Sequence, residues 1–153
     1  MNKDILHKEI DLIQACITRM AHNSFLIKGW CISLIAVILA LAVKDAPLLL
    51  VCCILLIPLF SFWYLDAFFL RTEKMYRAMY VWVLKKRSIG NKSYLYDLNP
   101  RRFENEVESE FEIMKSITLR CFYGIPTIIT ICIMLCKIIP MGASLIALLV
   151  SQN

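Results

Sequence analysis

Two charged residues beside long apolar segments are the strongest candidates for a charged site. Lys28 lies just inside the apolar segment 25–43, and Asp66 directly follows the apolar segment 47–65. If these segments are antiparallel helices joined near Asp45, positions equidistant from that turn lie at equal depth, which brings Lys28 close to Asp66. A carboxylate near hydrocarbon usually needs a counter-charge or hydrogen bonds. The alternative is that lipid headgroups and water solvate Asp66.

A second set of residues lies in the third apolar segment. Thr127, Thr130 and Lys137 follow one another at helical spacing, so they share a face if this segment is a helix. In an oligomer, repeated hydroxyls and a ring of lysines would line a water path that favours anions. Alternatively, the threonine hydroxyls bond to their own helix backbone and Lys137 extends its side chain to the membrane surface.

The N-terminal segment carries an apolar seam with alternating spacings of four and three. Its main members are Leu6, Ile10, Ile13 and Ile17. Such heptad-like spacing is typical of helices that pack together along one stripe. We interpret the seam as a surface for homo-oligomerisation, with packing against residues 70–87 of the same chain as the alternative.

Catalytic, metal-binding and cofactor-binding patterns are absent from the sequence. It contains no Gly-rich phosphate loop, no G-x-S-x-G and no H-E-x-x-H, and its only histidines are His7 and His22. The seven cysteines form no C-x-x-C pair, so we interpret them as small apolar side chains in a reducing compartment. We therefore expect no enzyme, no metal and no cofactor.

Several aromatic residues lie near basic residues and have the chemistry to stack nucleic-acid bases. Because they also suit packing or a membrane surface, we do not expect nucleic acid as a partner. These residues are Tyr76, Tyr80, Trp82, Tyr94 and Tyr96.

Composition and segment lengths predict the elements that must position these residues. Of the 153 residues, 59% are hydrophobic and 19% are charged, a balance shifted toward membrane proteins. The segments 25–43 and 47–65 are long enough to cross a bilayer. The sequence therefore predicts an all-α membrane protein, with a hairpin of two spans, a third span, and helices that extend into the cytoplasm.

The whole chain is expected to form one membrane domain with four parts. An amphipathic cytoplasmic helix over 1–24 leads into the two-span hairpin, 25–65. Basic cytoplasmic helices and a loop follow over 66–120, and the third apolar segment covers 121–150. Within 66–120 we expect the second helix to continue to Arg87, then a loop over 88–100 and a third helix from about Pro100. Alternating glutamates after Pro100 also suit a strand, but the adjoining span favours a helix.

The distribution of basic residues predicts the orientation in the membrane. Residues 1–28 carry four lysines and arginines and residues 66–120 carry eleven, whereas only Lys44 and Lys137 lie elsewhere. Because basic residues concentrate on the cytoplasmic side, we expect both charged regions, and with them the N-terminus, in the cytoplasm of a bacterium. Anionic lipid is the expected partner of these charges.

Residues 20–30 (MAHNSFLIKGW) and 62–77 (FWYLDAFFLRTEKMYR) together resemble a family of small bacterial inner-membrane proteins. Some similar proteins are membrane accessories of anti-phage defence, such as the pore-forming partner in type VI-B CRISPR systems. The resemblance implies a shared structural role at the inner membrane boundary for Asn23, Lys28, Trp30, Asp66, Arg71, Glu73 and Arg77.

Together with the resemblance, these features suggest an oligomeric membrane effector or accessory protein of an anti-phage defence system, one that alters inner-membrane permeability. A cytoplasmic component of that system would be a further partner. The alternative function is a non-conducting membrane anchor that recruits a cytoplasmic partner through its basic central segment.

Overall fold

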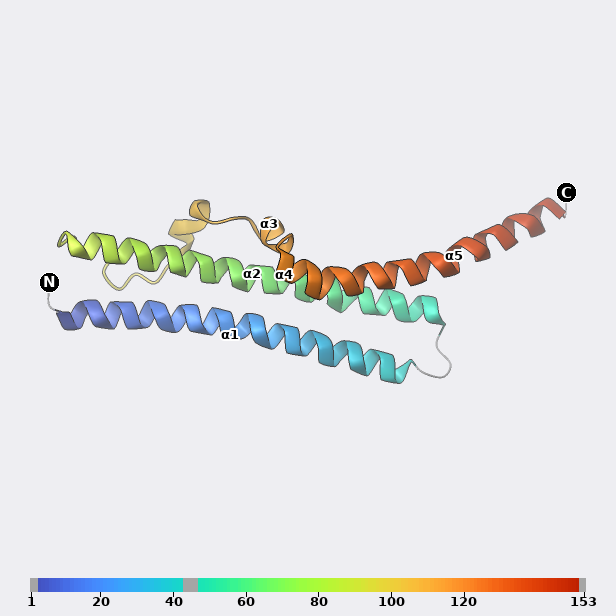
Figure 1. The fold of residues 1–153 in the computed structure, drawn as a ribbon, viewed down its shortest axis with the longest axis horizontal. Coiled ribbons are helices and arrows are strands. Elements are labelled where there is room, and N and C mark those ends of the chain that lie inside the picture. The colour runs from blue at the N-terminus through green and yellow to red at the C-terminus, as the bar shows by residue number, and fades with distance from the viewer. Residues whose placement is uncertain (1–2, 43–46, 152–153) are drawn as a thin grey trace. The chain divides into compact units, whose positions relative to one another are not determined.

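The computed structural model describes the backbone of residues 3–42 and 47–151, and the side chains of residues 4–42 and 47–140. Throughout these ranges the chain is helical, with loops but no strand (Figure 1). Within the described residues, three helices are long and apolar enough to cross a membrane, which confirms the expected fold class at this level. The predicted turn at Lys44–Asp45 lies outside the described residues.

Two uninterrupted helices carry the first two apolar segments. Helix α1, Lys3–Leu41, joins the amphipathic N-terminal segment and the first apolar segment into one element of 39 residues. Helix α2, Leu48–Ser88, has 41 residues and continues through Pro58. At 1.5 Å per residue each helix is about 60 Å long, roughly twice the hydrocarbon thickness of a bilayer. The expected continuation of both helices beyond the apolar segments is confirmed.

Helix α2 ends in a glycine-dependent cap. The Gly90 amide donates to the Arg87 carbonyl and the Asn91 amide donates to the Lys86 carbonyl, while Gly90 has a φ of +75°. This pair of hydrogen bonds is the Schellman arrangement, which favours glycine because other residues are strained at that angle. The loop expected over 88–100 therefore begins where the glycine allows the chain to turn.

The prediction of a third helix from about Pro100 that continues to residue 120 is wrong. The chain instead forms a 3₁₀ segment, η1 (Pro100–Glu106), and two short helices, α3 (Glu110–Met114) and α4 (Ile117–Leu119). The backbone is extended at Val107, and Ser109 begins α3 with a capping box formed with Glu112. A capping residue satisfies amides that a continuous helix would have bonded internally, so the helix restarts there.

The third long helix begins with a wide turn. Residues Arg120–Gly124 form a π-helical segment, η2, in which the Ile125 amide donates to the Arg120 carbonyl. Pro126 follows, and because proline has no amide hydrogen and its ring crowds the carbonyl four residues earlier, a wider turn accommodates it. Helix α5, Ile125–Ser151, then continues for 27 residues through Pro140.

The chain divides into two compact units. Unit 1 comprises residues 1–28 and 64–116, and unit 2 comprises residues 29–63 and 117–153. Unit 1 has an apolar core in which α1 packs against α2 and η1. The buried core residues are Ile13, Cys16, Met75, Tyr76, Met79, Val83 and Phe103.

Unit 2 has little buried surface for its hydrophobicity. In the most apolar 18-residue stretch of each of the three candidate spans, only 17, 28 and 22% of the residues are buried within the chain. Its exposed residues include Ile57, Ile128 and Leu135, which are large and apolar. Exposing so many apolar side chains to water is unfavourable, so this surface suits contact with lipid.

Candidate functional site

Lys28, Ser24 and Asp66 form a buried polar cluster in unit 1. Lys28 Nζ lies 2.5 Å from Asp66 Oδ2, and the Ser24 hydroxyl donates to Asp66 Oδ1. Lys28 Nζ also donates to Ser24 Oγ at 2.9 Å. The Asp66 side chain is fully buried, whereas that of Lys28 is 22% exposed. The structure therefore brings together the two charged residues that the antiparallel arrangement paired.

Local helix geometry positions this cluster. Ser24 and Lys28 are four residues apart on α1 and so lie on the same face. Asp66 is followed on α2 by Ala67, which is completely buried and whose small side chain allows close packing. A buried carboxylate needs hydrogen-bond donors or a counter-charge, and Ser24 and Lys28 supply both. The cluster therefore fixes the register of α1 against α2.

Arg71 and Lys74 link α2 to the segment that follows η1. Arg71 donates to Glu110 Oε1 at 2.8 Å and to the carbonyls of Glu104 and Glu108. Lys74 Nζ lies 2.8 Å from Glu108 Oε2, and its hydrogen bond lowers the pKa of Glu108. The pKa of Glu110 is lowered by a hydrogen bond from its own backbone amide and by Arg71, although burial opposes the shift.

The other residues that the resemblance assigned to the inner membrane boundary do not join the Lys28–Asp66 cluster in the contacts described. Glu73 pairs with Arg77 on α2, and Arg77 Nη2 lies 2.7 Å from Glu73 Oε1. Asn23 is half-buried, and Trp30 is 66% exposed. An exposed tryptophan at this point on α1 has the chemistry of an aromatic side chain at a membrane surface.

Two of the four residues of the N-terminal seam pack within the chain. Ile13 is 1% exposed and belongs to the core of unit 1, and Ile17 packs against that core. Leu6 and Ile10 are half-buried. The structure thus uses at least Ile13 and Ile17 in the second of the two arrangements that the spacing allowed, which is contact with α2 of the same chain.

The two threonines of the third apolar segment also adopt the alternative arrangement. The Thr127 hydroxyl donates to the Tyr123 carbonyl at 2.7 Å, and the Thr130 hydroxyl donates to the Pro126 carbonyl at 2.8 Å. Both threonines are buried in unit 2, whereas Lys137 is exposed. Because the hydroxyls bond to their own helix and are covered, they do not form a polar lining in the single chain.

A buried ion pair that we did not predict joins the start of α1 to the end of α2. Arg87 Nε and Nη2 each donate to the Glu9 carboxylate at 2.8 Å, and the two side chains are 0 and 2% exposed. Arg87 Nη1 donates to the carbonyls of Asn91 and Ser93, which closes the loop after α2. The antiparallel arrangement that paired Lys28 with Asp66, extended along both helices, would have found this pair.

Arg102 forms a second feature that we did not predict. Its guanidinium carbon lies 4.0 Å from the ring centre of Tyr94, 5.1 Å from that of Trp82 and 5.5 Å from that of Phe103. Arg102 Nη1 is also 3.6 Å from Asp97 Oδ2. These cation–π contacts explain the aromatic residues near basic ones in part as packing. Sequence spacing alone could not reveal the contacts, because they depend on how the loop folds back.

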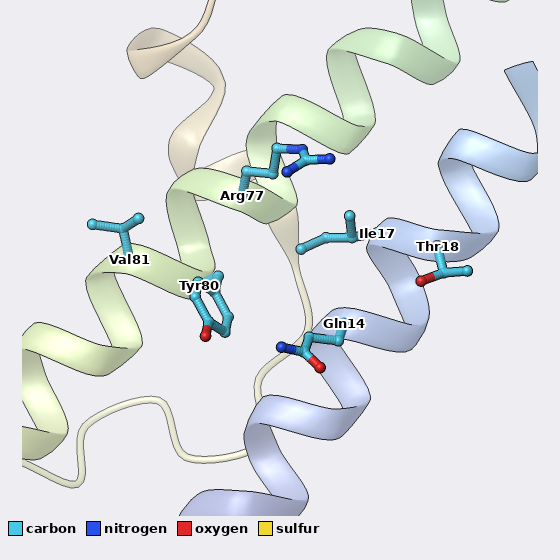
Figure 2. Close-up of a pocket in the computed structure, with 6 residues that line it drawn as sticks. All are labelled: Gln14, Ile17, Thr18, Arg77, Tyr80 and Val81. Carbon is cyan, nitrogen blue, oxygen red and sulfur yellow. The ribbon is translucent and has the colours of Figure 1, made fainter.

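A cleft of about 420 Å³ lies between α1 and α2 in unit 1. Figure 2 shows Ile17 and Arg77 extending toward each other across it, with Gln14 and Tyr80 facing each other nearby. Thr18 and Val81 complete its lining. The cleft is large enough for a small ligand. However, the Arg77 guanidinium is already paired with Glu73, so no unpaired charge defines a ligand class.

Within the described side chains, no three histidine, cysteine, aspartate or glutamate residues are grouped as metal ligands would be. All seven cysteines are free. Comparison with models of known protein families, with characterised proteins and with solved structures found no match to this chain.

Proposed function

We propose that the protein is a multi-pass protein of a bacterial inner membrane that anchors a folded cytoplasmic unit for recruitment of a partner. In this proposal unit 2 lies in the bilayer, and unit 1 lies in the cytoplasm with the N-terminus. The observation that carries it is the change in character along α1 and α2. Both helices run unbroken from the mostly exposed apolar residues of unit 2 into unit 1, which has its own core.

Charge supports the orientation. Fifteen of the 17 lysines and arginines lie in residues 1–28 and 66–120. The Lys28–Asp66 cluster lies at the ends of these two regions, where a charge needs a partner if hydrocarbon is near. The positive-inside rule then assigns unit 1 to the cytoplasm.

Thiol labelling tests this arrangement. In a variant whose seven native cysteines are replaced by alanine, Asp45→Cys should react with an impermeant reagent on intact spheroplasts. Lys92→Cys, at an exposed position of unit 1, should react only after the membrane is permeabilised. Labelling of Lys92→Cys on intact spheroplasts, with protection of Asp45→Cys, would contradict the orientation.

The second candidate function is a defence effector that alters membrane permeability. The observation that favours it is Lys137, an exposed charge on an apolar helix whose neighbours Leu135 and Ile139 are exposed too. In an oligomer, a ring of such lysines would favour anions. Thr127 and Thr130 no longer support this function, because their hydroxyls bond to the backbone.

Membrane-potential measurements separate the two functions. The anchor should leave cells polarised when it is expressed, and vesicles that contain it should retain chloride. The effector should depolarise cells and pass anions, and Lys137→Glu should reverse the preference for anions. Depolarisation by the parent protein together with such a reversal would replace the anchor by the effector.

A further inference from the structure

The loop after α2 and the last turn of that helix present an unusual mixture of exposed groups. Ile89 is 73% exposed, Tyr94 is 59% exposed and Tyr96 is 41% exposed. The lysines nearest to them in the sequence, Lys85, Lys86 and Lys92, are exposed or half-buried. We refer to this surface as the tip, and define it as Lys85, Lys86, Ile89, Lys92, Tyr94 and Tyr96.

Hydrogen bonds and a cation–π contact to the rest of unit 1 hold the tip in place. Arg87 bonds to Glu9 and to two loop carbonyls, and the Tyr96 amide donates to Glu9 Oε1 at 3.3 Å. The Arg102 guanidinium lies over the ring of Tyr94 at 4.0 Å. A surface already ordered in this way loses little conformational entropy when a partner binds.

The backbone of the tip is strained at its aromatic residues. Tyr94 has a φ of +57° and Tyr96 has a φ of +60°, a region that glycine and asparagine adopt far more readily. Strain of this kind persists where the surrounding contacts impose it, and it is concentrated at functional sites. Here it holds two tyrosines whose rings remain substantially exposed.

We propose that the tip binds an acidic segment of a cytoplasmic protein, one that carries aromatic or apolar side chains between its carboxylates. The carboxylates would pair with Lys85 and Lys92, and the apolar groups would contact Ile89 and the exposed part of Tyr94. Tyrosine is enriched at the centres of protein interfaces, and a rim of one charge selects partners of the other. This inference rests on the proposed anchor function, because it identifies the chemistry of the partner that unit 1 recruits.

The position of the tip disfavours the membrane itself as the partner. In the proposed arrangement Asp66 marks the membrane boundary, and the length of α2 from Asp66 to Ser88 is about 33 Å. This length is several times the Debye length at physiological ionic strength, so lipid charges would attract the lysines of the tip only weakly. Nucleic acid is disfavoured as the partner for two reasons. The exposed side chain of Ile89 is apolar, and Arg102 already covers part of the Tyr94 ring on which a base would stack. Binding of a single strand is therefore an outcome that the experiment must distinguish.

Fluorescence anisotropy on the full-length protein in neutral detergent tests the proposal. The probes are a labelled random copolymer of glutamate and tyrosine, and labelled oligothymidylate of similar charge. The copolymer should bind more tightly than the oligonucleotide. Tyr94→Ala should weaken its binding by about tenfold or more, as truncation of an interface hot spot does, whereas Tyr94→Phe should stay within about twofold. The double variant Lys85→Glu, Lys92→Glu changes only exposed positions and should weaken binding at least as much.

Matched substitutions elsewhere in unit 1 provide the control. Phe111→Ala and Lys115→Glu remove an exposed aromatic residue and an exposed lysine outside the tip, and should leave the affinity unchanged. Equal losses in these controls would overturn the proposal, since binding would then reflect general charge. Tighter binding of oligothymidylate would overturn it in favour of nucleic acid. No copolymer binding by the parent would also overturn it. The anchor function is tested separately, by the thiol labelling of Asp45→Cys and Lys92→Cys and by the membrane-potential measurements.

Discussion

At the scale of single residues, two ion pairs in unit 1 differ from the surface pairs in burial. Asp66 and Arg87 have fully buried side chains, whereas Lys74 and Glu108 are 45 and 57% exposed. Removing one partner of a buried pair leaves an uncompensated charge and costs about 3–5 kcal/mol, whereas an exposed pair contributes less than about 1 kcal/mol. The buried pairs are therefore where substitution should have large effects.

Asp66→Ala should lower the free energy of unfolding by up to about 3–5 kcal/mol, somewhat less because Lys28 is partly exposed. The loss follows because the Lys28 ammonium group loses its carboxylate partner. Adding Lys28→Leu should recover part of it. Unfolding in mixed detergent and dodecyl sulfate measures both, with Lys74→Ala as the exposed control. An Asp66→Ala variant as stable as the parent would show that the pair contributes nothing to stability.

Glu9→Ala should destabilise unit 1 by about 3–5 kcal/mol and open the loop after α2, because Arg87 would be left buried without its carboxylate. Hydrogen exchange of the amides of residues 93–99 should accelerate in this variant. Lys8→Ala, an exposed change next to it, should leave exchange unaltered. Protection of the loop amides equal to that in the parent would mean that Arg102 and the turn alone hold the loop.

At the scale of elements, carboxylates connect α3 and the residue before its cap to α2. The pKa of Glu108 is lowered mainly by Lys74, and that of Glu110 mainly by its own backbone amide and also by Arg71. A carboxyl group whose pKa is lower in the folded state stabilises that state above its unfolded pKa, which is about 4.3 for glutamate. This contribution is lost as the pH falls through the folded value.

Acidification should therefore detach residues 104–112 from α2 before the core of unit 1 unfolds. Spin labels at Glu106 and Ala78 measure the change, and their distance distribution should be unaltered from pH 7 to about pH 5 and should broaden as the pH falls below about 4. Glu108→Gln with Glu110→Gln should give the broad distribution already at pH 7. If this variant and the parent behave identically at every pH, these carboxylates do not hold the segment.

At the scale of the whole molecule, Ile13 of the α1 seam belongs to the core of unit 1, and Ile17 packs against that core. Ile13→Asp places a charge among Met75, Met79 and Val83, and should remove the protease resistance of unit 1. Membrane insertion and particle size in detergent should remain those of the parent, because the apolar residues of unit 2 are unchanged. Dissociation into smaller particles that keep protease resistance would instead identify the seam as an interface between copies.

The sequence by itself determined the long helices and the position of their charged ends. Apolar segments of bilayer length and the absence of breakers from Asp66 to Arg87 are local properties, and backbone hydrogen bonds within a helix depend on neighbouring residues. The approach of Lys28 to Asp66 followed from the same argument, since an antiparallel hairpin relates positions by simple counting.

Only the tertiary structure decided how the remaining residues are used. Heptad spacing does not reveal whether Ile13 meets its own chain or another copy, and helical spacing does not reveal whether Thr130 faces water or its own backbone. The break at Val107 and Ser109, and the pairing of Glu9 with Arg87, depend on side chains distant in sequence or on caps that compete with helix continuation. Such choices depend on free-energy differences between alternative contacts, and these differences exist only once the chain has folded.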